Sequence, residues 1–233
     1  MRPWAFAMDW VDALFLHWPI DAAQLRARIP ADLEIDTFEG AAWVSIVAFR
    51  IAGARLRGVP ARAAWRAFPE VNVRTYVRRD SHTGVWFLSL DADSRAAVSA
   101  GRAVVHLPYL HASIAASFGD DRVSYRLVRA DRRAPSARFG AEARYDGEAR
   151  VAEPGTLEHW LVERYAFFTT ARRRTLRGDV RHAPWQLRDA ITTIQENSLL
   201  VAAGLTPSAD APLAHVSDGV ETRAWPLSEP ERS

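Results

Sequence analysis

The chain has 233 residues, of which 48% are hydrophobic, and its 30 basic and 28 acidic residues leave a net charge of +2. These values are typical of a packed globular protein, so we expect a single domain over residues 1–233, with a polar tail from about residue 227. The absence of cysteine excludes disulfides and thiolate metal sites. The sequence also lacks lysine, so every basic residue is an arginine and no lysine amine is present to form a Schiff base.

The distribution of apolar and charged residues bears on location and partners. The apolar stretch 11–20 is interrupted by Asp12, His17 and Pro19, which makes it too short and too polar for a membrane span or a signal sequence. We therefore expect a cytoplasmic protein with no membrane partner. Arginine runs such as 172–174 carry no accompanying base-stacking motif, so a solvated surface is favoured and no nucleic-acid partner is expected.

The first elements follow from capping and alternation. Asp21 is a good N-cap for a helix that Pro30 ends. Apolar and polar residues alternate over 33–38, a turn signal follows at Glu39–Gly40, and residues 42–51 return as a second strand. This pattern predicts a hairpin.

The next segment contains the most informative strand. Residues 53–66 are rich in Gly, Pro, Ala and Arg and are expected to form an exposed loop or lid. Residues 69–77 alternate as a strand, which a turn over 80–84 joins to a second strand over 85–90. Asp93 or Ser94 then caps a short helix predicted to close at Gly101.

The second half of the chain continues the same pattern. Strands are predicted over 103–107, 112–118, 123–129 and 137–145. A helix opens at 154–156, and its predicted apolar stripe contains Leu157, Trp160, Leu161, Tyr165 and Phe168. The chain is therefore expected to be an α+β protein, mostly antiparallel sheet with a few peripheral helices.

One face of the strand over 69–77 carries Glu70, Asn72, Arg74 and Tyr76. On a sheet with one wet face, these residues are simply solvated. The same carboxylate, amide, guanidinium and phenol can instead line an interior cavity and orient a polar ligand. The alternation alone favours the solvated interpretation.

Six segments, taken in order along nearly the whole chain, resemble the bacterial family called domain of unknown function 2071 (YqjF-like). They are 17–19, 68–76, 84–92, 107–112, 157–165 and 182–185. That family is grouped with acetoacetate decarboxylase. The resemblance therefore implies a cone-shaped, largely antiparallel β-barrel with a buried pocket, and a homo-oligomeric assembly.

The resemblance also implies what the pocket lacks. The Ala-Gly-Arg stretch at 100–102 and the Leu-Pro at 107–108 align Tyr109 and Leu110 with the paired lysines of the decarboxylase, and Glu70 with its pocket glutamate. A pocket and one carboxylate are thus expected, without the nucleophile. Imine-based decarboxylation is excluded on chemical grounds.

The candidate site follows from these alignments. We expect Glu70, Tyr109 and His111 as candidates for acid–base chemistry. The expected ligand-binding residues are His17, Glu70, Asn72, Arg74, Trp86, Tyr109 and His111. The alternative is structural: Tyr109 and His111 are packed residues, and Glu70 forms an ion pair with Arg74.

The sequence contains no recognisable motif for binding a metal or a cofactor. The seven histidines show no HExxH motif and no paired i, i+4 spacing, so a metal site would need tertiary assembly, and none is expected. Phosphate-binding glycine loops are also absent, and no cofactor is expected.

Three functions remain open at this point. The first is a small-molecule-binding protein for an organic acid or carbonyl compound. The second is a lysine-independent hydrolase, lyase or isomerase, with Glu70 or His111 as base and Tyr109 with Arg74 as oxyanion partners. The third is an interaction module whose arginine surface binds an acidic partner. Ligand stabilisation without turnover favours the first, turnover that depends on Glu70 or Tyr109 favours the second, and salt-dependent binding to an acidic partner favours the third.

Overall fold

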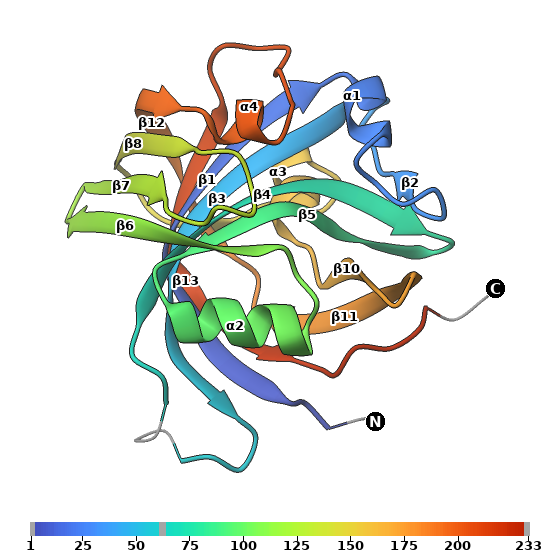
Figure 1. Ribbon diagram of the computed structural model, residues 1–233. Helices are drawn as coiled ribbons and strands as arrows, with labels where there is room; N and C mark the ends of the chain where they lie inside the picture. The colour runs from blue at the N-terminus through green and yellow to red at the C-terminus, as the bar shows by residue number, and fades with distance from the viewer. Residues whose placement is uncertain (1–2, 61–63, 231–233) are drawn as a thin grey trace.

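A computed structural model describes residues 3–60 and 64–230. These described residues form mostly β-sheet, with four short helices (Figure 1). The helices are α1 (Ala22–Arg26), α2 (Arg95–Val104), α3 (Leu157–Val162) and α4 (Leu199–Ala202). The strands are β1 (Phe6–Ile20), β2 (Glu34–Ile35), β3 (Ala42–Leu56), β4 (Phe68–Arg79), β5 (His82–Ala92), β6 (Tyr109–Gly119), β7 (Arg122–Arg129), β8 (Arg138–Tyr145), β9 (Arg150–Val151), β10 (Ala166–Ala171), β11 (Arg174–His182), β12 (Gln186–Asn197) and β13 (Leu213–Ala224). The expected α+β class with a mostly antiparallel sheet is confirmed.

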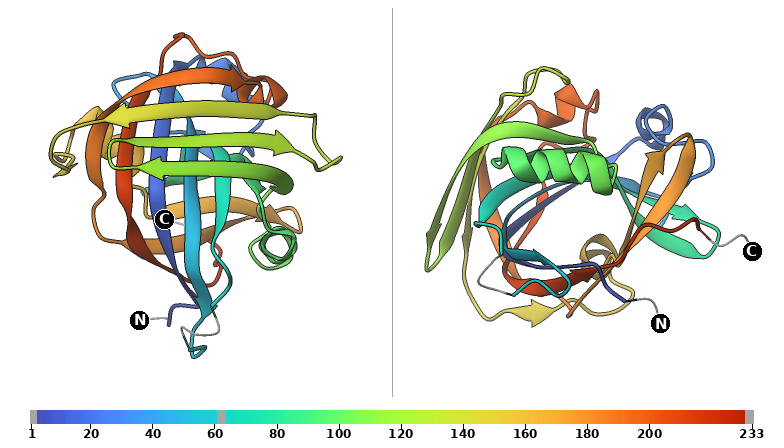
Figure 2. Two further views of the ribbon diagram at one scale, coloured as in Figure 1. Left: turned by 90° about the vertical axis from the view of Figure 1, so that its left-hand side faces the viewer. Right: turned by 60° about the horizontal axis from the view of Figure 1, so that its bottom comes forward.

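The strand order curls the sheet back on itself. The order is β2-β4-β3-β1-β13-β11-β10-β5-β6-β7-β8-β12-β9, and β4 also pairs with β5 while β13 also pairs with β12. The pairing of β4 with β5 closes seven strands into a ring, whose opening is visible on the right of Figure 2. On the left of Figure 2, strands β6, β7, β8 and β12 form a layer that runs across the long strands β1, β3 and β13.

Two hydrophobic clusters occupy the two faces of the long strands. Strand alternation separates them on β1, where Leu14 and Leu16 belong to one cluster and Ala13 and Phe15 to the other. The first cluster includes residues of the crossing layer, such as Phe139. We call the second one the inner cluster, because it receives residues of α2 and α3 and is built largely from strands of the ring.

Several local predictions are confirmed. The Asp21 side chain accepts a hydrogen bond from the backbone N–H of Ala23 and caps α1, and Ser94 caps α2 through the N–H of Ala97. The hairpin joining the strand over 69–77 to the next strand is present as β4 and β5. Its turn is tighter than expected, because β5 begins at His82.

The predicted hairpin over 33–51 is wrong. Strand β2 is only two residues long and pairs with β4, whereas β3 pairs with β1 and β4. The alternation over 33–38 gave no information on which strand is the partner, because long-range pairing competes with the local turn.

Two further predictions are wrong at helix ends. Helix α2 runs through Gly101 to Val104, so no strand forms over 103–107. Helix α3 ends at Val162, which places Tyr165 outside the helix and Phe168 in β10.

The expected loop over 53–66 is shorter than predicted, because β3 continues to Leu56. Residues 61–63 of that loop and residues 231–233 of the expected tail lie outside the described residues. Within the described residues, no helix is both long and apolar enough to cross a membrane.

Candidate functional site

The polar face of β4 points into the protein interior. Glu70 and Asn72 are each 2% exposed, Tyr76 is fully buried, and Arg74 is partly buried. Tyr76 belongs to the inner cluster. The solvated interpretation of this face is therefore wrong, because the curled sheet turns it inward.

Strand register places further polar residues beside β4. His17 on β1 pairs with Ser45 on β3, and Ser45 pairs with Arg74 on β4. Residues directly opposite each other on neighbouring strands share a face, so these three side chains form one row. The row lies on the inward-facing side of β1, β3 and β4, which we call the inner wall. The next row along contains His215 on β13, which pairs with Phe15 of β1.

One end of this wall carries a carboxyl group held by a phenol. The hydroxyl of Tyr109 donates to Oε2 of Glu70 at 2.9 Å, and Nδ2 of Asn72 lies 3.5 Å from Oε1 of the same carboxyl group. Burial raises the pKa of Glu70 to about 7, although both hydrogen bonds act to lower it. Near neutral pH this carboxyl group is thus poised to give or take a proton.

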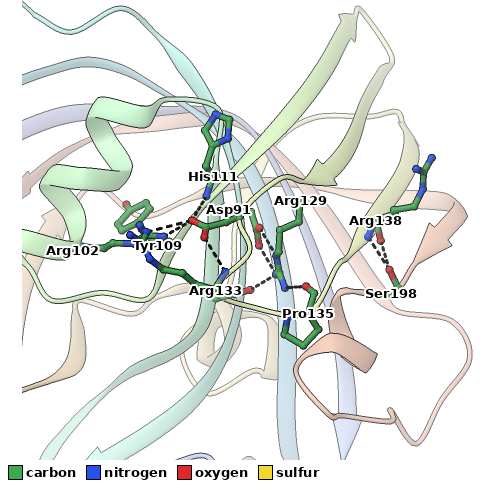
Figure 3. A network of polar contacts seen from close by, with 11 residues as sticks. Asp91, Arg102, Tyr109, His111, Arg129, Arg133, Pro135, Arg138 and Ser198 are labelled. Carbon is green, nitrogen blue, oxygen red and sulfur yellow. Dashed lines mark hydrogen bonds and ion pairs between the residues drawn. The ribbon is translucent and has the colours of Figure 1, made fainter.

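Helix α2 positions Tyr109. Nε of Arg102 donates to the backbone carbonyl of Tyr109 at 2.7 Å, and Arg102 also forms an ion pair with Asp131 (Figure 3). A Cβ on Gly101 would lie only 2.3 Å from the Tyr109 ring, so glycine permits the ring to pack against the helix. Gly101 is therefore not the helix terminator that the sequence pattern predicts, and Arg102 is a residue of the site that no motif indicates.

His111 stands apart from this pair. Its backbone N–H donates to Asp131 at 3.3 Å, and in Figure 3 its imidazole stands apart from the Tyr109 ring. No hydrogen bond joins its ring to Glu70 or Tyr109 among the described residues.

The other end of the wall contains a buried hydroxyl–imidazole network. Nδ1 of His17 lies 2.6 Å from Oγ of Ser45, which lies 2.6 Å from the hydroxyl of Tyr76. Burial, followed by the charges of His215 and Arg74, holds the pKa of His17 well below its usual value. The imidazole is therefore neutral, and its Nε2 is buried without a hydrogen-bond partner.

Arg74 lies on the same wall without a counter-ion. Its Nη2 donates to the carbonyl of Leu161 on α3 at 3.4 Å, and its buried Nε has no partner. Among the described residues it forms no ion pair, so the structural alternative of a Glu70–Arg74 pair is wrong. A guanidinium in this position is available to a carboxylate.

Arg164, which follows helix α3, packs on this end of the wall. Nη1 of Arg164 pairs with Asp36 at 2.7 Å, and its guanidinium lies over the rings of Trp160 and Tyr76. No sequence pattern predicts this contact or the position of Ser45, because both depend on which distant segments meet.

Trp86 does not join this group. It packs against the cluster on the opposite face of the sheet and lines a separate cavity of about 470 Å³, together with Arg28, Leu88, Leu107 and Phe168. Five of the seven expected residues lie on the inner wall or against it, namely His17, Glu70, Asn72, Arg74 and Tyr109. Among the seven, hydrogen bonds join Glu70, Asn72 and Tyr109 to one another.

The fold is that of acetoacetate decarboxylase-like proteins. A solved acetoacetate decarboxylase from Legionella pneumophila superposes with a TM-score of 0.68 at 13% identity, covering 98% of this chain and 87% of that one. The enduracididine biosynthesis enzyme MppR, solved in complex with pyruvate, gives 0.66 at 13% identity, covering 98% of this chain and 90% of that one.

Sequence comparison defines the family. The model for domain of unknown function 2071, described as an uncharacterized conserved protein, matches residues 7–221. The uncharacterized protein YqjF of Bacillus subtilis (strain 168) is 38% identical over 224 residues, covering 96% of this chain and 92% of that protein. The chain belongs to this family.

Proposed function

We propose that this protein binds a small organic acid or carbonyl compound on the inner wall, between Arg74 and the Glu70–Tyr109 pair. The observation that carries the proposal is the guanidinium of Arg74, which lies beside buried polar groups with no carboxylate partner. An uncompensated cation in a partly desolvated position is costly, and a ligand carboxylate would satisfy it.

The dimensions of the wall support a ligand with an apolar body. Arg74 lies four positions after Glu70, which corresponds to roughly 13 Å between their α-carbons on a strand. Phe15 and Val47 of the inner cluster lie on neighbouring strands between the two polar ends. A carboxylate at Arg74 and a carbonyl or hydroxyl near Tyr109 would fit such a surface. The pyruvate complex of MppR is consistent with this ligand class.

A second candidate is an enzyme without covalent catalysis, favoured by the pKa of about 7 at Glu70. Such a carboxyl group can act as general acid or base near neutral pH, with the Tyr109 hydroxyl as an oxyanion donor. Without lysine in the sequence, an imine-forming decarboxylase is excluded for both candidates.

The test is a binding screen of short keto acids, aryl acids and the matching amides by thermal shift, followed by calorimetry. Arg74→Met is expected to abolish acid binding, because it removes the carboxylate partner. Arg78→Met on the same strand is the control, since Arg78 is exposed and pairs only with Glu34. Equal affinity for an acid and its amide, or unchanged affinity in Arg74→Met, would contradict the proposal.

Turnover separates the two candidates. A bound acid that stays intact by NMR supports a binding protein. Consumption of the acid by the wild type, lost in Glu70→Gln while binding is retained, supports an enzyme.

A further inference from the structure

Three side chains outside the proposed ligand site meet where β12, β13 and α3 come together. Asp189 on β12 pairs directly with His215 on β13, so their side chains share a face. Glu158, in the first turn of α3, approaches both. Their nearest ligand atoms (Nε2 of the histidine and one oxygen of each carboxylate) all lie within 4.8 Å of one another.

His215 is buried without a hydrogen-bond partner. Its side chain is fully buried, and neither ring nitrogen makes a hydrogen bond to any residue that the structure describes. Its Nε2 is aimed at the carboxylates, 3.5 Å from Oε1 of Glu158 and 3.6 Å from Oδ1 of Asp189. A buried polar group without a partner is costly, so this imidazole needs an explanation.

The spacing of these atoms fits metal coordination better than hydrogen bonding. Distances of 3.5 and 3.6 Å are too long for a good N–H···O bond. In a tetrahedral zinc site with metal–ligand bonds of about 2.1 Å, neighbouring ligand atoms lie about 3.4 Å apart. We infer that Glu158, Asp189 and His215 bind a divalent transition-metal ion, with one imidazole nitrogen and two carboxylate oxygens as ligands and water in the remaining position.

The donor set narrows the class of metal. One imidazole with two carboxylates suits zinc, cobalt or manganese, whereas calcium and magnesium prefer oxygen ligands alone. The two histidine–carboxylate distances are compatible with tetrahedral zinc. The site opens to solvent through Asp189, whose side chain is 72% exposed.

Arg150 on β9 is the competitor of the metal. Its Nη2 donates to the same two oxygens, at 3.1 Å from Oε1 of Glu158 and 2.8 Å from Oδ1 of Asp189. The guanidinium thus neutralises these carboxylates when no metal is bound. Metal binding displaces the guanidinium into solvent, and the half-exposed side chain of Arg150 has room for this movement.

Competition between Arg150 and the metal distinguishes a metal site from a cluster that is held together only by ion pairs, because such a cluster would not bind metal. Untagged protein is titrated with Co²⁺ and followed by visible absorption, and with Zn²⁺ by calorimetry. Wild type is expected to bind one equivalent with a tetrahedral Co²⁺ spectrum. Arg150→Met is expected to bind about tenfold more tightly, because it removes the competing cation.

The ligand variants and a control complete the experiment. Asp189→Asn lies at an exposed position that folding tolerates, and it is expected to weaken binding by at least about tenfold, with His215→Phe abolishing it. Arg188→Met is the control, because Arg188 makes a similar two-bond pair with Asp218, which is not one of the three inferred ligands. The inference is overturned if neither wild type nor Arg150→Met shows saturable binding, or if binding survives Asp189→Asn unchanged.

Discussion

At the scale of single residues, burial decides what the polar groups of the inner wall can do. Glu70 and His17 carry ordinary ionisable side chains, yet burial raises the pKa of the first and lowers the pKa of the second. Both shifts favour the neutral form. Of the two guanidinium groups at this wall, Arg164 pairs with Asp36, whereas Arg74 forms no ion pair among the described residues.

The raised pKa of Glu70 makes stability depend on pH. An acid whose folded pKa exceeds its unfolded value contributes stability that is fully present below the unfolded pKa of 4.5 and lost as pH rises through about 7. Between about pH 4.5 and pH 7, the unfolding free energy of the wild type should fall by on the order of 3 kcal/mol relative to that of Glu70→Gln. Urea unfolding of both proteins across this pH range measures the difference.

Two variants sharpen this prediction. Glu148→Gln, at an exposed position, should give no such pH-dependent difference. Tyr109→Phe should raise the pKa of Glu70 further, because it removes a hydrogen bond to the charged carboxylate. A flat difference between wild type and Glu70→Gln would mean that the carboxyl group is hydrated.

At the scale of elements, helix α2 and the start of β6 form one unit around Tyr109. Gly101 lets the ring pack against the helix, and Arg102 fixes the backbone that follows. Helix propensity alone favours alanine at position 101 by about 1 kcal/mol. The contact with Tyr109 opposes this gain.

Gly101→Ala is therefore expected to destabilise the protein, although helix propensity alone predicts that it is stabilising. The added Cβ would lie 2.3 Å from Cδ2 of Tyr109, so the ring must move. We expect a net loss of about 1–3 kcal/mol in unfolding free energy, typical of overpacking, and a shift in the pH dependence of Glu70. Ser99→Ala, exposed in the same helix, serves as the matched control and should be slightly stabilising.

At the scale of the whole molecule, a buried ion pair joins the crossing layer to the ring. Arg129 on β7 makes two bonds of 2.7 Å to Asp91 on β5, and it also donates to Ser89 and to the carbonyl of Pro135 (Figure 3). The two charged side chains are 3% and 0% exposed. No local sequence pattern predicts this pair, because Asp91 and Arg129 lie on strands that only the tertiary structure brings together.

Arg129→Met should destabilise the fold by about 3–5 kcal/mol, since it leaves a buried carboxylate unpaired. Thermal and denaturant unfolding measure this loss. The double variant Arg129→Met with Asp91→Asn should recover part of it, because the uncompensated charge is gone. Equal stability of the single and double variants would show that Asp91 does not need its partner.

The sequence by itself determined the class of fold, the hairpin of β4 and β5, the helix cap at Asp21, and the absence of lysine chemistry. These features depend on alternation, capping and composition, which act between near neighbours or along the whole chain. The family segments also identified Glu70 and Tyr109 as candidates for one site.

Tertiary structure decided which strands are partners and which way their faces point. It placed β2 beside β4, turned the face of Glu70 and Tyr76 inward, and moved Trp86 to another cavity. It also brought Ser45 to His17 and Asp189 to His215. Strand alternation fixes which residues share a face, but only the closure of the sheet decides which face is inside.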